Sequence, residues 1–216
     1  MKTEVVNKWY VEWKVELSKY KYFILLSLIF LFLAERLNFY ASSYVDRLPS
    51  IAVKDLILNN IPTLNLWIIF IYGPFLFFSL IILYTLFFRV KEFHKVAILF
   101  SLLIFVRSIF ITLTHIGAPT DASVANANYG FFNFFTFKND LFFSGHVAMP
   151  FMAFLIFRKE AIGKIFLALT IISALTVLFM HVHYSIDVFS AFFITYGVYS
   201  FGQWLLNKDI FNKTNI

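Results

Sequence analysis

The sequence contains no cysteine among its 216 residues. Disulfides, thiolate metal sites and a cysteine nucleophile are therefore all excluded. Charged residues are also scarce, at 14% of the chain, whereas hydrophobic residues make up 61%. A soluble domain of this length could not cover so much apolar surface with so few polar side chains, so the composition predicts that the bilayer is the solvent.

The apolar residues fall into six runs of about spanning length, separated by short polar segments. The runs are Phe23–Phe39, Leu66–Phe88, Val96–Ile116, Leu141–Phe157, Ile165–Val182 and Val188–Leu206. We therefore predict an all-α fold, a polytopic membrane bundle with about six transmembrane helices. The fourth and fifth runs are short, and a buried re-entrant segment could imitate either of them.

The distribution of basic residues predicts the orientation, because Lys and Arg in short loops are retained on the cytoplasmic side. Most of the 18 Lys and Arg residues precede the first run or follow the second, fourth and sixth runs. The alternate loops hold only Arg47, Lys54 and Lys138. Both termini are thus predicted to be cytoplasmic. The same bias accounts for the pI of about 9.4, so the charge indicates no nucleic-acid partner.

We expect three segments in one catalytic unit. Residues 1–22 alternate apolar and charged positions as an amphipathic helix at the cytoplasmic interface does. Residues 23–206 form the six-span membrane domain, and residues 207–216 form a cytoplasmic tail. The second outer loop carries the exposed phenylalanines Phe131, Phe132, Phe134 and Phe135, which indicate a segment that dips into the outer leaflet or covers a pocket.

A few ionisable residues lie in or beside the apolar runs, where each is costly and therefore a candidate for function. They are Arg107, Asp140, His146, His181, His183 and Asp187. The predicted topology brings all of them to the outer ends of the spans. Because hydropathy and loop charge alone defined the spans, this convergence independently supports a single site at the outer face.

The spacing of His183 and Asp187 suits a catalytic pair. If both are helical, they share a face, and the carboxylate can accept the Nδ1–H of the imidazole. The other nitrogen, Nε2, is then a nucleophile or base. Ser144 and Gly145 at a helix start offer backbone N–H groups to a phosphate, and Arg107 could neutralise its oxygens.

Two other interpretations of these residues stay open. His183 and Asp187 could form a structural polar clamp between helices. Alternatively, His146, His181, His183 and Asp187 could bind zinc in a metal-binding membrane protein, since imidazole and carboxylate are zinc ligands. A transporter is less well supported, because no internal repeat is found.

The segments Ser144-Gly145-His146 and His183-Tyr184-Ser185-Ile186-Asp187 resemble the two histidine motifs of the sphingomyelin synthase-like family, within the type 2 phosphatidic acid phosphatase superfamily. The resemblance implies that His183 attacks phosphorus to give a phosphohistidine, oriented by Asp187. It implies that His146 acts first as general acid and then as base, and that Asp140 assists substrate binding. No metal or other cofactor is implied.

The chain also departs from the phosphatases of that superfamily. Their Lys/Arg motif ending in Arg-Pro is absent, and no Arg precedes the nucleophilic His. With Arg107 as the one evident cation, the site suits a singly charged phosphodiester better than a monoester. We therefore expect a phosphotransferase whose partners are a phospholipid donor and a lipid alcohol acceptor. The alternative is a phosphatase or phospholipase C-type hydrolase with the same residues.

Overall fold

The computed structural model describes residues 2–122 and 139–207, and side chains from residue 9 onward. The described part contains six α-helices and no strands, so the predicted all-α bundle is confirmed. The helices are α1 (Lys2–Asp46), α2 (Trp67–Phe88), α3 (Phe93–Leu113), α4 (Gly145–Phe157), α5 (Ala161–Phe179) and α6 (Ser185–Asn207), with short 3-10 turns η1 (Leu58–Asn60) and η2 (Val90–Glu92). The Phe-rich segment 131–135 and most of the predicted tail lie outside the described residues.

Four helical segments are long and apolar enough to cross a membrane by length and composition. They are Trp9–Asp46, Trp67–Phe88, Val90–Leu113 and Ala161–Phe179. The fifth long helix, α6, has 23 residues but is less apolar; of its polar residues, Asp187 and Thr195 are fully buried. Helix α4 is the short one.

Helix α4 begins four residues later than its apolar run. Its 13 residues extend only about 20 Å at 1.5 Å per residue, less than the hydrocarbon thickness of about 30 Å. The preceding stretch is non-helical yet buried, with Leu141 at 4% exposure and both Phe143 and Ser144 at 0%. Irregular backbone is tolerated at membrane depth only inside protein, so α4 starts within the bundle.

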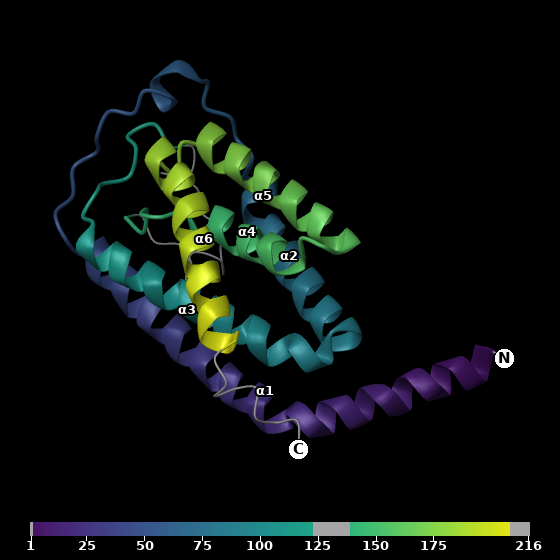
Figure 1. Cartoon of the computed structure of the whole chain (residues 1–216). Coiled ribbons are helices and arrows are strands. Elements are labelled where there is room, and N and C mark those ends of the chain that lie inside the picture. The colour runs from purple at the N-terminus through teal and green to yellow at the C-terminus, as the bar shows by residue number, and fades with distance from the viewer. Residues whose placement is uncertain (1, 123–138, 208–216) are drawn as a thin grey trace.

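The helices pack around a continuous apolar core contributed by α2 to α6, while α1 lies along the outside of α3 (Figure 1). Alanines 148, 153 and 191 and Gly202 let the backbones approach closely, as is usual in membrane bundles. A Cβ at Gly202 would lie 2.4 Å from Cδ2 of Leu99, so a larger residue there would require the Leu99 side chain to move.

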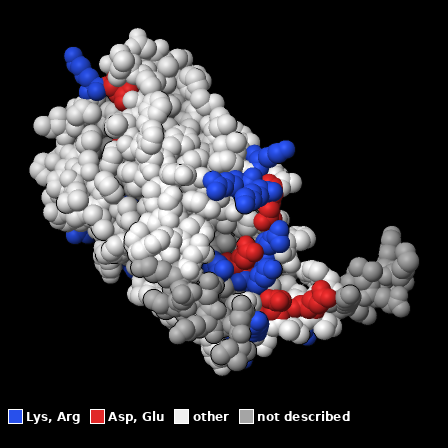
Figure 2. Space-filling model, viewed as in Figure 1, with Lys and Arg blue, Asp and Glu red and all other residues white. Residues whose placement is uncertain are grey.

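Figure 1 shows the N-terminal part of α1 extending beyond the other helices, although Nε1–H of Trp13 still donates to the carbonyl of Leu86 in α2. Figure 2 shows Lys and Arg side chains gathered at the side of the molecule where the α2–α3 and α4–α5 turns lie. Exposed Lys91, Arg158 and Lys159 belong to these turns. This side is the one that the charge distribution predicts to be cytoplasmic.

Candidate active site

The connection between α5 and α6 carries His183, and the first turn of α6 carries Asp187. His183 precedes the helix, but its Nδ1 still lies 3.4 Å from Oδ2 of Asp187. The same Oδ2 accepts a hydrogen bond of 2.9 Å from the backbone N–H of Tyr184, the residue before α6. A carboxylate in the first turn that reaches back to the preceding N–H caps a helix, so Asp187 fixes both the start of α6 and the position of the histidine.

Both members of this pair are buried. Asp187 has no exposed surface, and His183 is 5% exposed. In the described part of the chain, Oδ1 of Asp187 and Nδ1 of His183 have no partner within hydrogen-bond geometry. Buried polar atoms are rarely left unsatisfied, and where they are, a functional role is a common reason.

The second histidine enters from the first turn of α4. The ring of His146 stacks on Phe70 of α2, with centroids 4.4 Å apart and planes 16° apart. Its centroid lies 6.4 Å from that of His183, with the two planes at 61°. The structure therefore brings the two predicted catalytic imidazoles together across the interface between α4 and the α5–α6 connection.

The start of α4 is joined to the start of α6. The backbone N–H of Ser144 donates to the carbonyl of Asp187 at 3.2 Å. Ser144 is fully buried, and its hydroxyl has no partner among the described residues. The first-turn N–H groups of a helix have no acceptor within the helix. The backbone N–H of Ser144 is thus occupied, which leaves the Ser144 hydroxyl and the first-turn N–H groups of α4 as donors for an anion; phosphate binding at this turn stays a prediction.

Arg107 of α3 is buried at the site, but its guanidinium is bonded to protein groups. Nη1 and Nη2 donate to the two carboxylate oxygens of Asp140 at 3.2 and 2.7 Å. Nε donates to the carbonyl of Phe143 at 2.9 Å, and Nη1 also reaches Oδ1 of Asn38 at 3.2 Å. Gly145 leaves room for this side chain, since a Cβ there would lie 3.2 Å from Nε.

The sequence predicted both Arg107 and Asp140 as substrate-binding residues, and the structure pairs them with each other. Asp140 also accepts a hydrogen bond of 2.9 Å from the hydroxyl of Ser42 in α1. The pair carries no net charge, and it ties α1 and α3 to the segment that leads into α4. Sequence reasoning missed Asn38 and Ser42. Two polar residues four apart in an apolar run were the available signal.

Loops cover this end of the bundle, and two residues that sequence reasoning also missed hold them. Asp55 accepts the backbone N–H groups of Ile57 and Leu58 at η1, and the N–H and hydroxyl of Ser185 at the start of α6. Burial alone would raise its pKa, but these hydrogen bonds together lower the pKa of Asp55. Tyr184 accepts a bond from the N–H of Val53 and donates to the carbonyl of Gly117.

His181 belongs to a different cluster from His183. Its Nδ1 lies 2.6 Å from Oδ2 of Asp121 and 3.3 Å from Oγ1 of Thr63. Within residues 2–122 and 139–207, no three His, Asp or Glu side chains are grouped closely enough to hold a metal ion. The zinc arrangement that would use His181 with His146, His183 and Asp187 therefore has no support in the described part.

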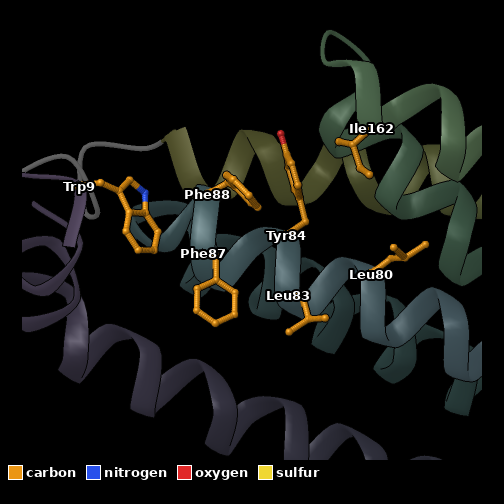
Figure 3. Close-up of a pocket in the computed structure, with 7 residues that line it drawn as sticks. All are labelled: Trp9, Leu80, Leu83, Tyr84, Phe87, Phe88 and Ile162. Carbon is orange, nitrogen blue, oxygen red and sulfur yellow. The ribbon is translucent and has the colours of Figure 1, made fainter. Parts of the chain in front are cut away.

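A groove of about 430 Å³ lies elsewhere, between α2, the N-terminal part of α1 and the start of α5 (Figure 3). Its lining consists of Trp9, Leu80, Leu83, Tyr84, Phe87, Phe88 and Ile162. This apolar lining suits hydrocarbon and offers no site for a phosphate. The groove is therefore separate from the histidine site in both position and chemistry.

Comparison with known proteins gives one match to a family model. Residues 139–204 match the family model described as PAP2 superfamily C-terminal. The matched segment contains the residues of both histidine motifs, whereas Arg107 lies before it. No curated protein and no solved structure matches the chain. The match supports the type 2 phosphatidic acid phosphatase superfamily and, with it, a phosphatase or phosphotransferase acting on lipid phosphates.

Proposed function

We propose that this protein is an integral-membrane phosphotransferase, similar to sphingomyelin synthases, that moves a phospho-alcohol head group from a phospholipid to a lipid hydroxyl. The observation that carries the proposal is the constellation of partly buried His146 with buried His183 and Asp187. Two imidazoles face each other across a helix interface, and a carboxylate adjoins Nδ1 of one of them. This arrangement supplies a nucleophile, its orienting group and a proton carrier.

In the first half-reaction, Nε2 of His183 attacks phosphorus, and the bond from phosphorus to the glycerol oxygen of the donor breaks. A ring N–H of His146 gives its proton to that oxygen, which leaves as a diacylglycerol hydroxyl. Asp187 stabilises the positive charge that develops on the phosphorylated imidazole. The hydroxyl of Ser144 and the first-turn N–H groups of α4 donate to the phosphoryl oxygens.

In the second half-reaction, the hydroxyl oxygen of the acceptor lipid attacks phosphorus and the bond from phosphorus to Nε2 breaks. The acceptor proton passes to His146, which restores the starting state. Water in place of the lipid would give hydrolysis with the same residues. We place the site at the outer face, with both termini cytoplasmic, on the strength of the loop-charge distribution.

Charge at the site favours a diester substrate. Arg107 is close enough for its charge to act on His146, but that charge is balanced by Asp140 at 2.7 Å. A phosphomonoester dianion usually requires several unpaired cations, whereas a diester carries one negative charge. The transferase therefore fits the residues better than a monoester phosphatase.

A hydrolase is the second candidate, because the superfamily that the 139–204 match supports is named for a phosphatase. One assay distinguishes the two. The purified protein is incubated with a phospholipid labelled in its head group and with a panel of lipid alcohols, including ceramide and diacylglycerol. Transfer predicts a labelled lipid product that depends on the acceptor. Release of only water-soluble label with every acceptor, or a preference for phosphatidic acid, would establish the hydrolase instead.

A further inference from the structure

Two adjacent charged residues, Glu35 and Arg36, are exposed in the C-terminal third of α1. Eleven and ten residues separate them from the end of the helix at Asp46, which is about 16 Å at 1.5 Å per residue. The helix is a candidate span. In its most apolar stretch 11% is buried, compared with 50% in the span Val90–Leu113 that contains α3. Both side chains are exposed and lie within the predicted first span, Phe23–Phe39, about one turn from its end at Phe39.

Charged side chains at this depth are costly and are normally paired or turned into a bundle. Among the described residues, neither Glu35 nor Arg36 takes part in an ion pair within 4 Å. The guanidinium of Arg36 lies over the rings of Phe39 and Tyr40, at 4.9 and 5.5 Å from their centroids. Glu35 experiences a Coulombic attraction to Arg107 but makes no hydrogen bond to it. Neither charge thus has an ion-pair partner among the described residues, although the charge of Arg107 partly compensates that of Glu35.

The surface around these charges has the spacing of a helix-packing seam. The buried side of α1, which faces α3, contains Ser27, Ala34, Ala41 and Val45. The opposite side carries a second series at steps of four and three residues. That series is Leu25, Ile29, Phe32, Arg36, Phe39 and Ser43. Alternating steps of this kind keep one stripe of a helix against a partner helix, and Glu35 flanks the stripe where interhelical ion pairs form.

We propose that this stripe of α1, hereafter the α1 seam, is the contact between two copies of the chain. The copies are related by a two-fold axis parallel to the membrane normal, with their α1 helices side by side. Arg36 of each copy then faces Glu35 of the other, so one contact pairs four charges. An isologous interface makes this match automatically, because each copy presents both the residue and its complement.

The other possible occupant of the α1 seam is a lipid. A phosphate could approach Arg36, but it would leave Glu35 unpaired and would add a further negative charge beside it. A cationic head group could approach Glu35, but it would leave Arg36 unpaired and would add a further positive charge beside it. A second copy satisfies both charges at once, which is why the adjacent pair favours it.

The absence of cysteine allows a direct test by cross-linking in membranes. Phe32→Cys in the full chain places one thiol on the α1 seam, and Leu33→Cys places one at nearly the same depth but about 100° around the helix. Both side chains are exposed, at 63% and 55%. Oxidation should give a disulfide-linked dimer for Phe32→Cys and several-fold less for Leu33→Cys. Equal yields from the two positions would overturn the proposed seam.

Charge reversal tests the ion pairs themselves. In the Phe32→Cys background, Glu35→Arg or Arg36→Glu alone should lower the dimer yield several-fold, because each puts like charges together. The two changes combined restore complementarity across the axis and should restore the yield. If the double variant stays as low as the single ones, or if the single variants cross-link normally, reciprocal pairing is wrong. Glu35→Gln and Arg36→Gln replace the reversals where a reversed charge prevents accumulation, and each should also lower the yield.

Discussion

Asp140 binds both terminal nitrogens of Arg107 through its two carboxylate oxygens, so the cation predicted for the substrate is neutralised by its own chain. Both side chains are largely buried, at 8% exposure for Arg107 and 14% for Asp140. A bidentate pair of this kind fixes orientation as well as charge. Because Arg107 also holds the carbonyl of Phe143, the pair determines where α4 begins and hence where His146 stands.

Asp140→Ala should therefore destabilise the protein strongly. Removing one partner leaves a buried guanidinium without compensation, which costs about 3–5 kcal/mol. Ser42→Ala removes one hydrogen bond to the same carboxylate and should cost only about 1 kcal/mol. Thermal unfolding in detergent measures both. The double variant Arg107→Met with Asp140→Leu should recover much of the loss. If Asp140→Ala alone were as stable as the natural chain, the pair would not be what anchors this segment.

His183→Ala should abolish capture of phosphate on the protein. Asp187→Asn should lower turnover by about 10²–10⁴-fold, since the amide disfavours the imidazole tautomer that leaves Nε2 free. His146→Ala should differ in kind. It should still become phosphorylated by a donor with a good leaving group, such as a nitrophenyl phosphodiester, while failing with phospholipids.

Labelled donor and acid-labile phosphoprotein measure these outcomes. His181→Ala is the control, because His181 pairs with Asp121 outside the constellation. Near-normal phosphorylation of His183→Ala would show that the nucleophile lies elsewhere.

Asp55 should make stability depend on acid pH. Its folded-state pKa is lowered, so its contribution is fully present above the unfolded pKa of about 3.9 and is lost as pH falls through the lower folded value. Asp55→Asn, which cannot accept all of the same bonds, should be less stable than the natural chain at pH 6. The difference in Tm should shrink as pH falls from 4 towards 3. A difference that stays constant over this range would mean that the carboxylate charge is unimportant.

The orientation can be tested with single cysteines. Leu48 lies in the connection between α1 and α2, and Lys91 lies in an exposed turn at the basic end of the bundle. An impermeant maleimide should label Leu48→Cys in intact cells, and Ala125→Cys likewise. It should label Lys91→Cys only after permeabilisation. The reverse pattern would place the histidine site on the cytoplasmic side.

The apolar runs were sufficient to predict the helices, because hydropathy reflects the direct contact of each span with the lipid bilayer. Predicted and observed bounds agree within a few residues for α2, at Leu66–Phe88 against Trp67–Phe88. They differ where tertiary contacts override hydropathy. Residues 141–144 belong to a run as apolar as a membrane-spanning helix, but their backbone is held out of a helix by hydrogen bonds to Arg107 and to the carbonyl of Asp187.

In the candidate site too, some residues could be predicted from the local sequence and some contacts could not. The histidine motifs and Asp187 could be selected because each is an unusual polar residue in an apolar segment. The pairing of Arg107 with Asp140 and the bond from Val53 to Tyr184 could not, since these contacts join residues 33 and 131 positions apart. No local pattern encodes such contacts.

The balance between transfer and hydrolysis depends on access of water to the phosphorylated His183. The Phe-rich segment 131–135, which lies outside the described residues, is predicted to cover the outer pocket. The described loops already cover part of this end through Asp55 and Tyr184. A positioned lipid hydroxyl has an effective concentration that can exceed that of water by orders of magnitude, so a shielded intermediate should partition towards lipid.

Replacing Phe131, Phe132, Phe134 and Phe135 by Ser should admit water and raise the ratio of free phospho-alcohol to transferred head group several-fold, while donor cleavage continues. Phe201→Ser, at an exposed position in the last part of α6, serves as the matched control and should leave the ratio unchanged. An unchanged ratio in the quadruple variant would show that the Phe-rich segment does not control access, and the preference for lipid would then have to come from the described loops.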